Sequence, residues 1–259
     1  MVRSRGVKGV KSSKGAKLNK SMKPHSINKN SSIKSVKLRS AILFSGGKDS
    51  GLALNYSLEY TKVKCLIIIE SKNPESYMFH TPNIRWAVLQ AKASGIPCII
   101  QKTNGEKEKE LKDLELAIKA AKKRYKVQAV VTGAIESAYQ ASRVQTITNA
   151  LGMECFNPLW QKDQIELLEE LIDKKFEIII IGVFGYGMDK LIGKRIDRKF
   201  IDDVKSLREK LKINPAGEGG EYESFILNAP YFNKSLNISK SRIFKDDSGG
   251  IVLDIEELS

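Results

Sequence analysis

One short segment of the sequence reads AILFSGGKDS, from residue 41 to residue 50. Its first four residues are apolar and predict a buried strand. The two glycines that follow let the backbone approach a ligand closely, and the loop leads into a predicted helix whose free N–H groups favour an anion. Lys48 adds a positive charge, two serines add hydroxyl donors, and Asp49 is suited to hold a metal ion or orient the loop. We interpret residues 45–50 as a phosphate-binding loop.

Strand-like and helix-like segments alternate along the chain after this loop. Apolar runs predict strands at 38–44, 64–70, 98–101, 128–132 and 177–183. Helices are expected at about 50–60, 81–95, 106–125, 136–151, 163–175 and 200–211, and a loop with short strands over 217–259. This alternation predicts an α/β fold with a doubly wound parallel sheet and a smaller C-terminal region. Ligands bind beyond the carboxyl ends of the strands in such sheets.

Local signals mark several of the expected helix ends. Thr81 followed by Pro82 is typical of a helix start, and Gly95 is typical of a helix end. Asp163 and Glu166 form a capping-box pattern. We expect the helix that begins at Thr81 to bury Ile84, Val88 and Ala91.

Length and composition exclude several classes of protein. A chain of 259 residues suits one large α/β domain with or without a small appendage, and 41% hydrophobic residues is a globular composition. The longest apolar runs have the length of a strand, which excludes an integral membrane protein. The three cysteines stand apart in or beside apolar segments, so a disulfide scaffold or a cysteine-rich metal site is not expected.

The net charge of +14 is concentrated at the amino-terminal end. The first 40 residues hold 12 Lys and Arg and no acid, whereas the remaining 219 hold 32 basic and 30 acidic residues. We predict a disordered basic tail over residues 1–37. Its role stays open between contact with RNA or the ribosome, an organelle transit segment, and a dispensable solvated extension. It has no apolar core of the secretory type, and we expect a cytoplasmic protein.

Three further polar segments follow the predicted strands and the last helix. They read ESKNPESYMFHTPNI at 70–84, GAIESAYQASRV at 133–144 and PAGEGGEYESF at 215–225. Taken by itself, the first segment is equally consistent with an ordinary polar loop, the second with a solvated helix face, and the third with a mobile acidic turn. The spacing of Glu136, Tyr139, Gln140 and Arg143 places them on one face of a helix. The glutamates of the third segment are suited to bind Mg²⁺, attract ammonium or accept its proton.

The phosphate loop and these three segments resemble the motifs of known enzymes. The loop lacks the spacing of a Walker loop and is similar to the SGGxDS loop of the N-type ATP pyrophosphatases, or PP-loop enzymes, which cleave ATP between its α- and β-phosphates. All four segments together resemble the diphthine–ammonia ligase family, over about residues 38–235. Many relatives carry a basic residue where this chain has Ala141, and the basic tail is not part of the family core.

The resemblance implies a fold and a reaction. The fold is adenine nucleotide alpha hydrolase-like, with an ATP-binding PP-loop domain over 38–150 and a C-terminal substrate and catalytic region over 151–259. The reaction uses ATP and Mg²⁺ to adenylate the carboxylate of diphthine, a modified histidine on translation elongation factor 2. Ammonia then displaces AMP and forms diphthamide. The implied partners are elongation factor 2 and ammonia, with no membrane.

The resemblance also implies site residues. Catalytic roles fall to Lys48, Asp49, Glu218, Glu221 and Glu223, with Asp49 holding the metal ion. ATP-binding roles fall to Ser45, Gly46, Gly47, Lys48, Asp49, Ser50 and Gly133. Substrate-binding roles fall to Asn73, Glu75, Ser76, Tyr77, His80, Glu136, Tyr139, Gln140, Arg143, Lys194, Arg195, Asp197, Gly219 and Gly220. We expect the cations Lys194 and Arg195 near the leaving pyrophosphate.

Two other functions remain as alternatives. A PP-loop enzyme that modifies a tRNA base would use the same loop and would suit the basic tail. A nucleotide-dependent RNA- or ribosome-binding protein is the alternative without catalysis, and the intact phosphate loop disfavours it. Sulfur insertion is disfavoured because the cysteines are dispersed in apolar contexts.

Overall fold

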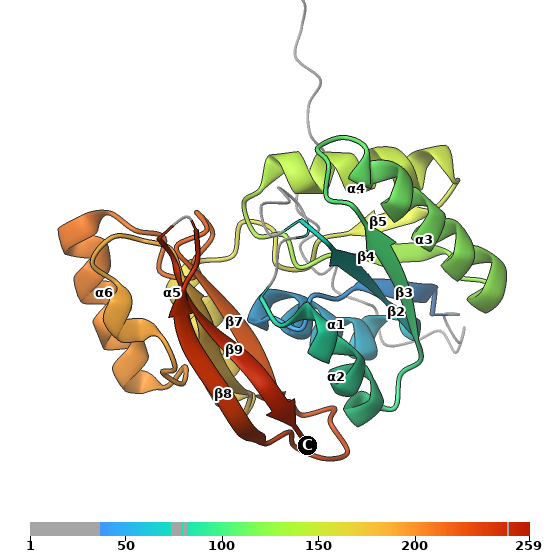
Figure 1. Cartoon of the computed structure of the whole chain (residues 1–259). Coiled ribbons are helices and arrows are strands. Elements are labelled where there is room, and N and C mark those ends of the chain that lie inside the picture. Colours follow the sequence, from blue (N-terminus) through green and yellow to red (C-terminus); the bar gives the residue numbers. More distant parts are fainter. Residues whose placement is uncertain (1–36, 74–78, 80–81, 248) are drawn as a thin grey trace, which may run out of the picture. The chain divides into compact units, whose positions relative to one another are not determined.

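Five parallel strands form the first of two sheets (Figure 1). The computed structural model describes residues 37–73, 79, 82–247 and 249–259. The predicted basic tail, except Lys37, and the predicted residues Glu75, Ser76, Tyr77, His80 and Thr81 therefore lie outside the described residues. The strands are β1 (Arg39–Leu43), β2 (Lys62–Ser71), β3 (Cys98–Thr103), β4 (Ala129–Val131) and β5 (Glu154–Phe156).

The strand order β3-β2-β1-β4-β5 confirms the predicted doubly wound fold. The chain builds outward from β1 to β3 and then returns to place β4 on the other side of β1. The strand order therefore reverses between β1 and β4. A doubly wound sheet binds its ligands at that point, beyond the carboxyl ends of the strands.

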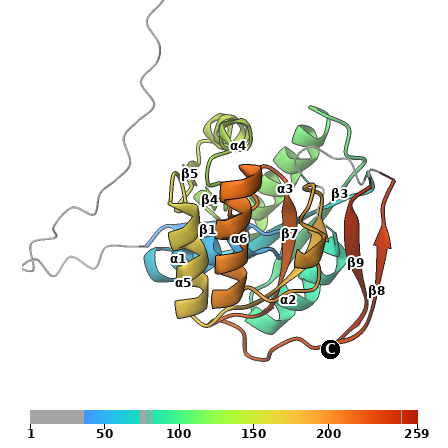
Figure 2. The ribbon, with the colours of Figure 1, turned by 90° about the vertical axis from the view of Figure 1, so that its left-hand side faces the viewer.

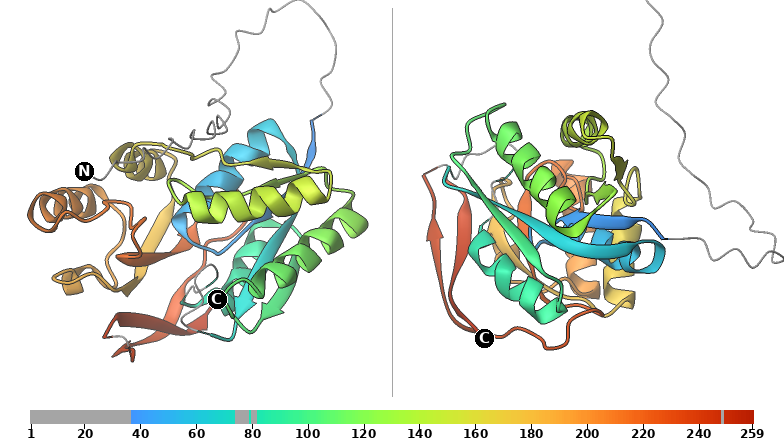
Figure 3. Two further views of the ribbon diagram at one scale, coloured as in Figure 1. Left: turned by 90° about the horizontal axis from the view of Figure 1, so that it is seen from above. Right: turned by 90° about the vertical axis from the view of Figure 1, so that its right-hand side faces the viewer.

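Four helices cover the two faces of this sheet. They are α1 (Lys48–Tyr60), α2 (Ala87–Ser94), α3 (Glu110–Tyr125) and α4 (Ala138–Ala150). Alternate side chains of the strands separate the two faces: Ile42 and Leu66 pack with α1 and α2, whereas Ala41 and Cys65 pack with α3 and α4. The helices α3 and α4 lie side by side over their face (Figure 3, left).

The second sheet is antiparallel and follows in the sequence. It contains β6 (Glu177–Val183), β7 (Tyr222–Asn228), β8 (Ile238–Lys245) and β9 (Ile251–Leu258), in the order β7-β6-β9-β8. The helices α5 (Gln164–Asp173) and α6 (Arg198–Leu211) run side by side (Figure 2). The described residues also form two 3₁₀ turns, η1 (Ile84–Trp86) and η2 (Asp189–Leu191).

One apolar core joins the two sheets. Leu52 of α1, Leu168 of α5 and Phe200 of α6 belong to the same buried cluster as Ile178 and Ile226 of the second sheet. The other face of β6 packs in a separate cluster through Ile181. The strand predicted at 177–183 is thus present and is buried on both faces for most of its length, and it is antiparallel to its neighbours.

Several predicted helix boundaries differ from the structure. The helix α3 begins at Glu110 instead of 106, and α4 begins at Ala138 because the Ser137 side chain accepts a hydrogen bond from the Gln140 N–H. The helix expected from 81 is the turn η1 followed by α2, which ends at Gly95 as predicted. Val88 is exposed on α2, whereas Gln90 is fully buried. Ala91 is buried as predicted and Ile84 is partly buried against the core, so the apolar spacing failed at Val88 alone, where a buried amide replaces an apolar side chain.

Other predicted elements need smaller changes. Asp163 caps α5 through two backbone N–H groups, as the capping-box pattern predicted. The short strand β5 was missed, and the strands after residue 215 are seven or eight residues long. No helix in the described part of the chain is long and apolar enough to cross a membrane.

Candidate functional site

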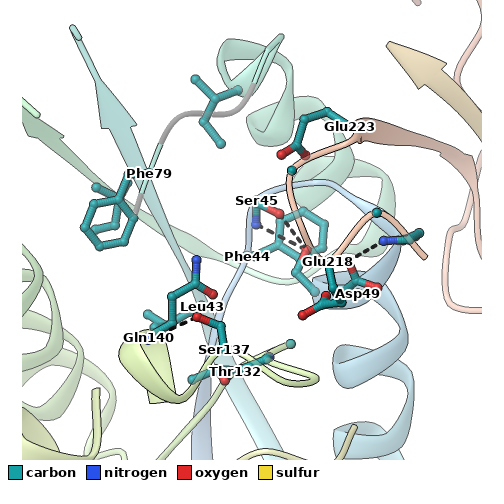
Figure 4. Close-up of a pocket in the computed structure, with 18 of the residues that line it drawn as sticks. Leu43, Phe44, Ser45, Asp49, Phe79, Thr132, Ser137, Gln140, Glu218 and Glu223 are labelled. Atoms are coloured by element: carbon teal, nitrogen blue, oxygen red, sulfur yellow. Dashed lines mark hydrogen bonds and ion pairs between the residues drawn. The ribbon is translucent and has the colours of Figure 1, made fainter. Parts of the chain in front are cut away.

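A cavity of about 460 Å³ lies beyond the carboxyl ends of β1, β2 and β4 (Figure 4). The phosphate loop forms its floor with Ser45, Lys48 and Asp49. Residues 217–220, which precede β7, line it from the second sheet. The cavity is therefore built where the strand order of the first sheet reverses, and both halves of the chain contribute side chains.

Hydrogen bonds within the loop hold its backbone around the start of α1. The Ser50 hydroxyl lies 3.1 Å from the Ser45 hydroxyl, accepts from the Ser45 N–H at 3.2 Å and donates to the Gly47 carbonyl at 3.1 Å. Gly46 has a φ of 83°, which favours glycine. Gly47 makes no side-chain cap at the start of α1, and Lys48, Asp49 and Ser50 of the first helical turn line the cavity, which gives a favourable environment for phosphate.

Lys48 and Asp49 form an ion pair at the edge of the cavity. Lys48 Nζ lies 2.7 Å from Asp49 Oδ2 and 5.5 Å from the centre of the Tyr222 ring, and the Lys48 side chain is 5% exposed. Asp49 Oδ1 is buried and has no hydrogen-bond partner among the described residues. This leaves one carboxylate oxygen able to take a cation or an ordered water.

The described residues contain no cluster of three His, Cys, Asp or Glu side chains suited to a metal ion. Mg²⁺ bound with nucleotides is usually held by one or two carboxylates together with phosphate oxygens and water. The free oxygen of Asp49 beside the phosphate loop fits that arrangement. The residues present therefore suit Mg²⁺ that arrives with a nucleotide.

The glutamates of the predicted acidic loop occupy two different environments. Glu218 and Glu223 line the cavity. Glu221 instead accepts hydrogen bonds within its own loop, from the N–H and the side chain of Asn214 at 2.7 and 2.9 Å and from the Gly219 N–H at 2.8 Å. Glu221 therefore shapes the loop that carries the other two carboxyls.

The environment of Glu218 and Glu223 favours their neutral form. Burial raises the pKa of Glu218 to about 7; the negative charge of Asp49 adds to this rise, and Lys48 opposes it. Burial also raises the pKa of Glu223 to about 7, again opposed by Lys48. Two carboxyl groups that titrate near neutral pH thus face one cavity, an arrangement common in sites of proton transfer.

Gly133 allows the segment after β4 to touch the phosphate loop. A Cβ atom on Gly133 would stand 2.7 Å from Asp49 C and from Ser50 N, which are backbone atoms that cannot move aside. Thr132 and Ala134 on either side also line the cavity. The predicted ATP-binding glycine is thus required by close packing against the start of α1.

The structure brings many of the predicted residues to the cavity. Those that line it are Ser45, Lys48, Asp49, Ser50, Gly133, Gln140, Glu218, Gly219, Gly220 and Glu223. Gly46 and Gly47 lie in the loop below, where the Gly46 carbonyl accepts from Ile226 N–H at 3.0 Å. The Glu136 N–H donates to Glu218 Oε2 at 3.3 Å, so Glu136 supports a lining residue.

Other predicted residues make contacts away from the lining. Tyr139 and Arg143 donate to Glu108, each at 2.9 Å, so of these three residues on the predicted polar face of α4 only Gln140 lines the cavity. Asn73 donates from its side chain to the Gly105 carbonyl at 3.1 Å. Within the second half, Lys194 pairs with Asp203, Arg195 pairs with Glu177, and Asp197 caps α6. The structure does not bring these cations to the phosphate loop.

Sequence reasoning missed residues that hold or line the site. Apolar side chains of Leu43, Ile67, Ile69 and Phe79 form one wall of the cavity. Ser224 and Gln90 hydrogen-bond the phosphate loop from outside the cavity. The position of Ile69 at a predicted strand end was a usable signal for the wall, whereas the sequence contains no local signal for Gln90.

Comparison with known proteins adds to this geometry. A family model described as the diphthamide synthase N-terminal domain matches residues 38–155, and one described as the diphthamide synthase C-terminal domain matches residues 163–258. The chain belongs to the diphthamide synthase family. The first match contains the phosphate loop and the second contains Glu218 and Glu223, so the cavity of this family member is lined from both matched regions.

Curated relatives carry the name diphthine–ammonia ligase. The mouse protein is 31% identical over 225 residues, which cover 79% of this chain and 84% of that protein. The human protein is 29% identical over 238 residues, or 80% of this chain and 85% of that protein. The Schizosaccharomyces pombe protein is 29% identical over 81% of this chain, which spans only 37% of that longer relative.

A solved structure also matches this member of the diphthamide synthase family. It is a predicted subunit of tRNA methyltransferase from Methanocaldococcus jannaschii, with a TM-score of 0.40 and 16% identity. The match covers 76% of this chain and 99% of that chain.

Proposed function

We propose that this chain is a diphthine–ammonia ligase, an ATP-dependent carbon–nitrogen ligase that converts diphthine on translation elongation factor 2 to diphthamide. Family membership supports the reaction. The observation that carries the proposal is a phosphate loop and two carboxyl groups of raised pKa, Glu218 and Glu223, that face one cavity. Residues 38–150 bind ATP, and residues 151–259 supply the acidic loop.

ATP binds with its phosphates on the loop and its base on the apolar wall. The N-terminus of α1, the Lys48 ammonium and the two loop hydroxyls favour the negative charge of the phosphates. The wall formed by Leu43, Ile69 and Phe79 suits a flat base. Mg²⁺, held by Asp49 and phosphate oxygens, would neutralise charge that develops on the leaving group.

In the first half-reaction, the diphthine carboxylate forms a bond to the α-phosphorus of ATP. The bond between the α-phosphorus and the bridging oxygen breaks, and pyrophosphate leaves with the electron pair. Lys48 and the start of α1 stabilise the charge that accumulates there. The product is an acyl-adenylate, whose carbonyl carbon is open to a nitrogen nucleophile.

In the second half-reaction, ammonium must lose a proton before its nitrogen can attack. Glu218 or Glu223, ionised at a pH above about 7, accepts that proton. The nitrogen then bonds to the acyl carbon, AMP leaves with the electron pair of the broken C–O bond, and the nitrogen gives a second proton to water. Residues 217–220 limit the access of water, which would otherwise hydrolyse the adenylate.

The test supplies the full chain with ATP, ammonium and elongation factor 2 that carries diphthine, beside bulk tRNA as the other acceptor. We expect AMP and pyrophosphate in equal amounts with diphthamide, and only with the protein acceptor. ADP and phosphate as main products would exclude the PP-loop reaction. AMP release that depends on tRNA instead would favour the tRNA-modifying alternative.

A further inference from the structure

Tyr186 is 93% exposed at the tip of the loop between β6 and η2. Glycines stand on both sides of it, at 185 and 187. A Cβ atom on Gly187 would lie 3.2 Å from Cδ1 of Leu211, a side chain that is itself 40% exposed. Tyr186 and Leu211, here called the Tyr186 patch, thus expose an aromatic ring and an aliphatic side chain from neighbouring segments.

The Tyr186 patch is joined to the acidic loop of the cavity. The N–H groups of Phe184 and Gly185 donate to the Glu221 carbonyl at 2.8 and 3.1 Å. Glu221 lies between Gly220 and Tyr222, both of which line the cavity. The loop that presents Tyr186 is therefore hydrogen-bonded to the segment that borders the cavity, and a molecule that contacts one is positioned to reach the other.

Three lysines surround the patch in the sequence. Lys210 and Lys212 flank Leu211, and Lys190 follows Tyr186 by four residues. All three are exposed, and none of them forms an ion pair with a described residue. An exposed apolar pair whose neighbours in the sequence include unpaired cations fits a protein surface that has an apolar depression bordered by carboxylates.

We propose that the Tyr186 patch is the docking surface for the protein that carries the diphthine side chain. This inference rests on the proposed function. A substrate side chain attached to a folded protein brings that protein's surface against the border of the cavity. An exposed tyrosine at such a border is the kind of residue that contributes most to binding, because its ring buries a large area at small entropic cost.

The experiment measures amide formation by the full-length chain as the concentration of diphthine-bearing elongation factor 2 varies. It compares the wild type with Tyr186→Ala, Tyr186→Phe and Tyr60→Ala. Tyr60 is a matched control because it is also exposed, at 69%, but lies at the far end of α1. Affinity for ATP and the single-turnover rate at saturating protein substrate are measured for each variant.

We expect Tyr186→Ala to raise the KM for the protein substrate at least about tenfold, with ATP affinity and the saturated rate unchanged. Tyr186→Phe and Tyr60→Ala should resemble the wild type. A normal KM in Tyr186→Ala, with an active wild type, would overturn the docking proposal alone, as would altered self-association of the chain in place of a KM effect. A wild type that forms no amide would instead overturn the proposed function.

Discussion

The backbone N–H of Lys48 donates a hydrogen bond to the Ser224 hydroxyl, 176 residues later in the sequence, at 3.1 Å. A second bond from β7 runs from the Ile226 N–H to the Gly46 carbonyl at 3.0 Å. The buried side chain of Gln90 donates to that carbonyl and to the Ile226 carbonyl, at 3.0 and 2.7 Å. The phosphate loop of the first sheet is therefore held in place by a strand of the second sheet.

Removing the Ser224 hydroxyl should weaken ATP binding. In Ser224→Ala, the buried Lys48 N–H loses its partner, and the loop relaxes to find another. We expect the Kd for ATP to rise about tenfold, equivalent to about 1.4 kcal/mol and within the usual cost of an unsatisfied buried donor. Calorimetric titration with ATP measures this. Ser241→Ala, on the exposed strand β8, is the control, and equal affinities in the two variants would contradict the prediction.

The rate of amide formation should depend on the ionisation of Glu218 and Glu223. The base must be ionised to accept a proton, and the pKa of both groups is raised to about 7. We expect the single-turnover rate to rise with pH through a midpoint near 7 and to level off above it. Changing the glutamate that acts as base to Gln should lower the rate by about 10²-fold or more. An unchanged profile in both Gln variants would remove these groups from the chemistry.

The same two groups should make the folded chain less stable as pH rises. Their pKa is raised in the folded state above the unfolded value of about 4.3. Between these values the folded state binds more protons, so their contribution to the free energy of unfolding falls as pH increases. The free energy of unfolding of Glu223→Gln, relative to that of the wild type, should therefore be higher at pH 8 than at pH 5. Urea unfolding at both pH values checks this, and a difference of opposite sign would contradict it.

Glu221→Gln should affect the reaction less than Glu218→Gln. Glu221 accepts three hydrogen bonds inside its loop and does not line the cavity, and an amide oxygen can keep the bonds from Asn214. We expect a rate loss below about tenfold, through loosening of the loop. The sequence resemblance by itself predicted a catalytic role for this residue. A loss as large as that of Glu218→Gln in single-turnover measurements would restore that role.

Gly133→Ala should disturb the site without touching its polar side chains. The added methyl group would stand 2.7 Å from two backbone atoms at the start of α1, and overpacking of this kind costs about 1–3 kcal/mol. We expect a lower thermal midpoint and weaker ATP binding together. A variant with both properties intact would show that the backbone at this contact shifts freely.

The basic tail should not be needed for ATP binding. The described residues that line the cavity lie between Leu43 and Glu223. Deleting residues 1–36 should leave the Kd for ATP within about twofold, while any salt-sensitive association with RNA weakens. Titrations with ATP and with RNA at two salt concentrations check both parts. Loss of ATP affinity in a folded truncation would place the segment at the site.

Local sequence determined the phosphate loop and the strand and helix that flank it. In residues 41–60 the apolar run, the two glycines and the polar helix start all act over a few residues, so the pattern alone predicts the element that forms. The same holds for the Asp163 cap of α5. The glycines and glutamates of the segment at 217–223 left its role open, and the family resemblance is what indicated Glu218 and Glu223.

Only the tertiary structure decided how residues distant in sequence combine. Helical spacing places Gln140 and Arg143 on one face of α4. In the structure, Arg143 donates a hydrogen bond to Glu108 in the loop before α3, whereas Gln140 lines the cavity. Gln90 and Ser224 carry no local signal, because a buried polar side chain is satisfied by whichever backbone groups the packed sheets bring to it. Spacing along the chain specifies a face of an element, and the packing of elements specifies what that face contacts.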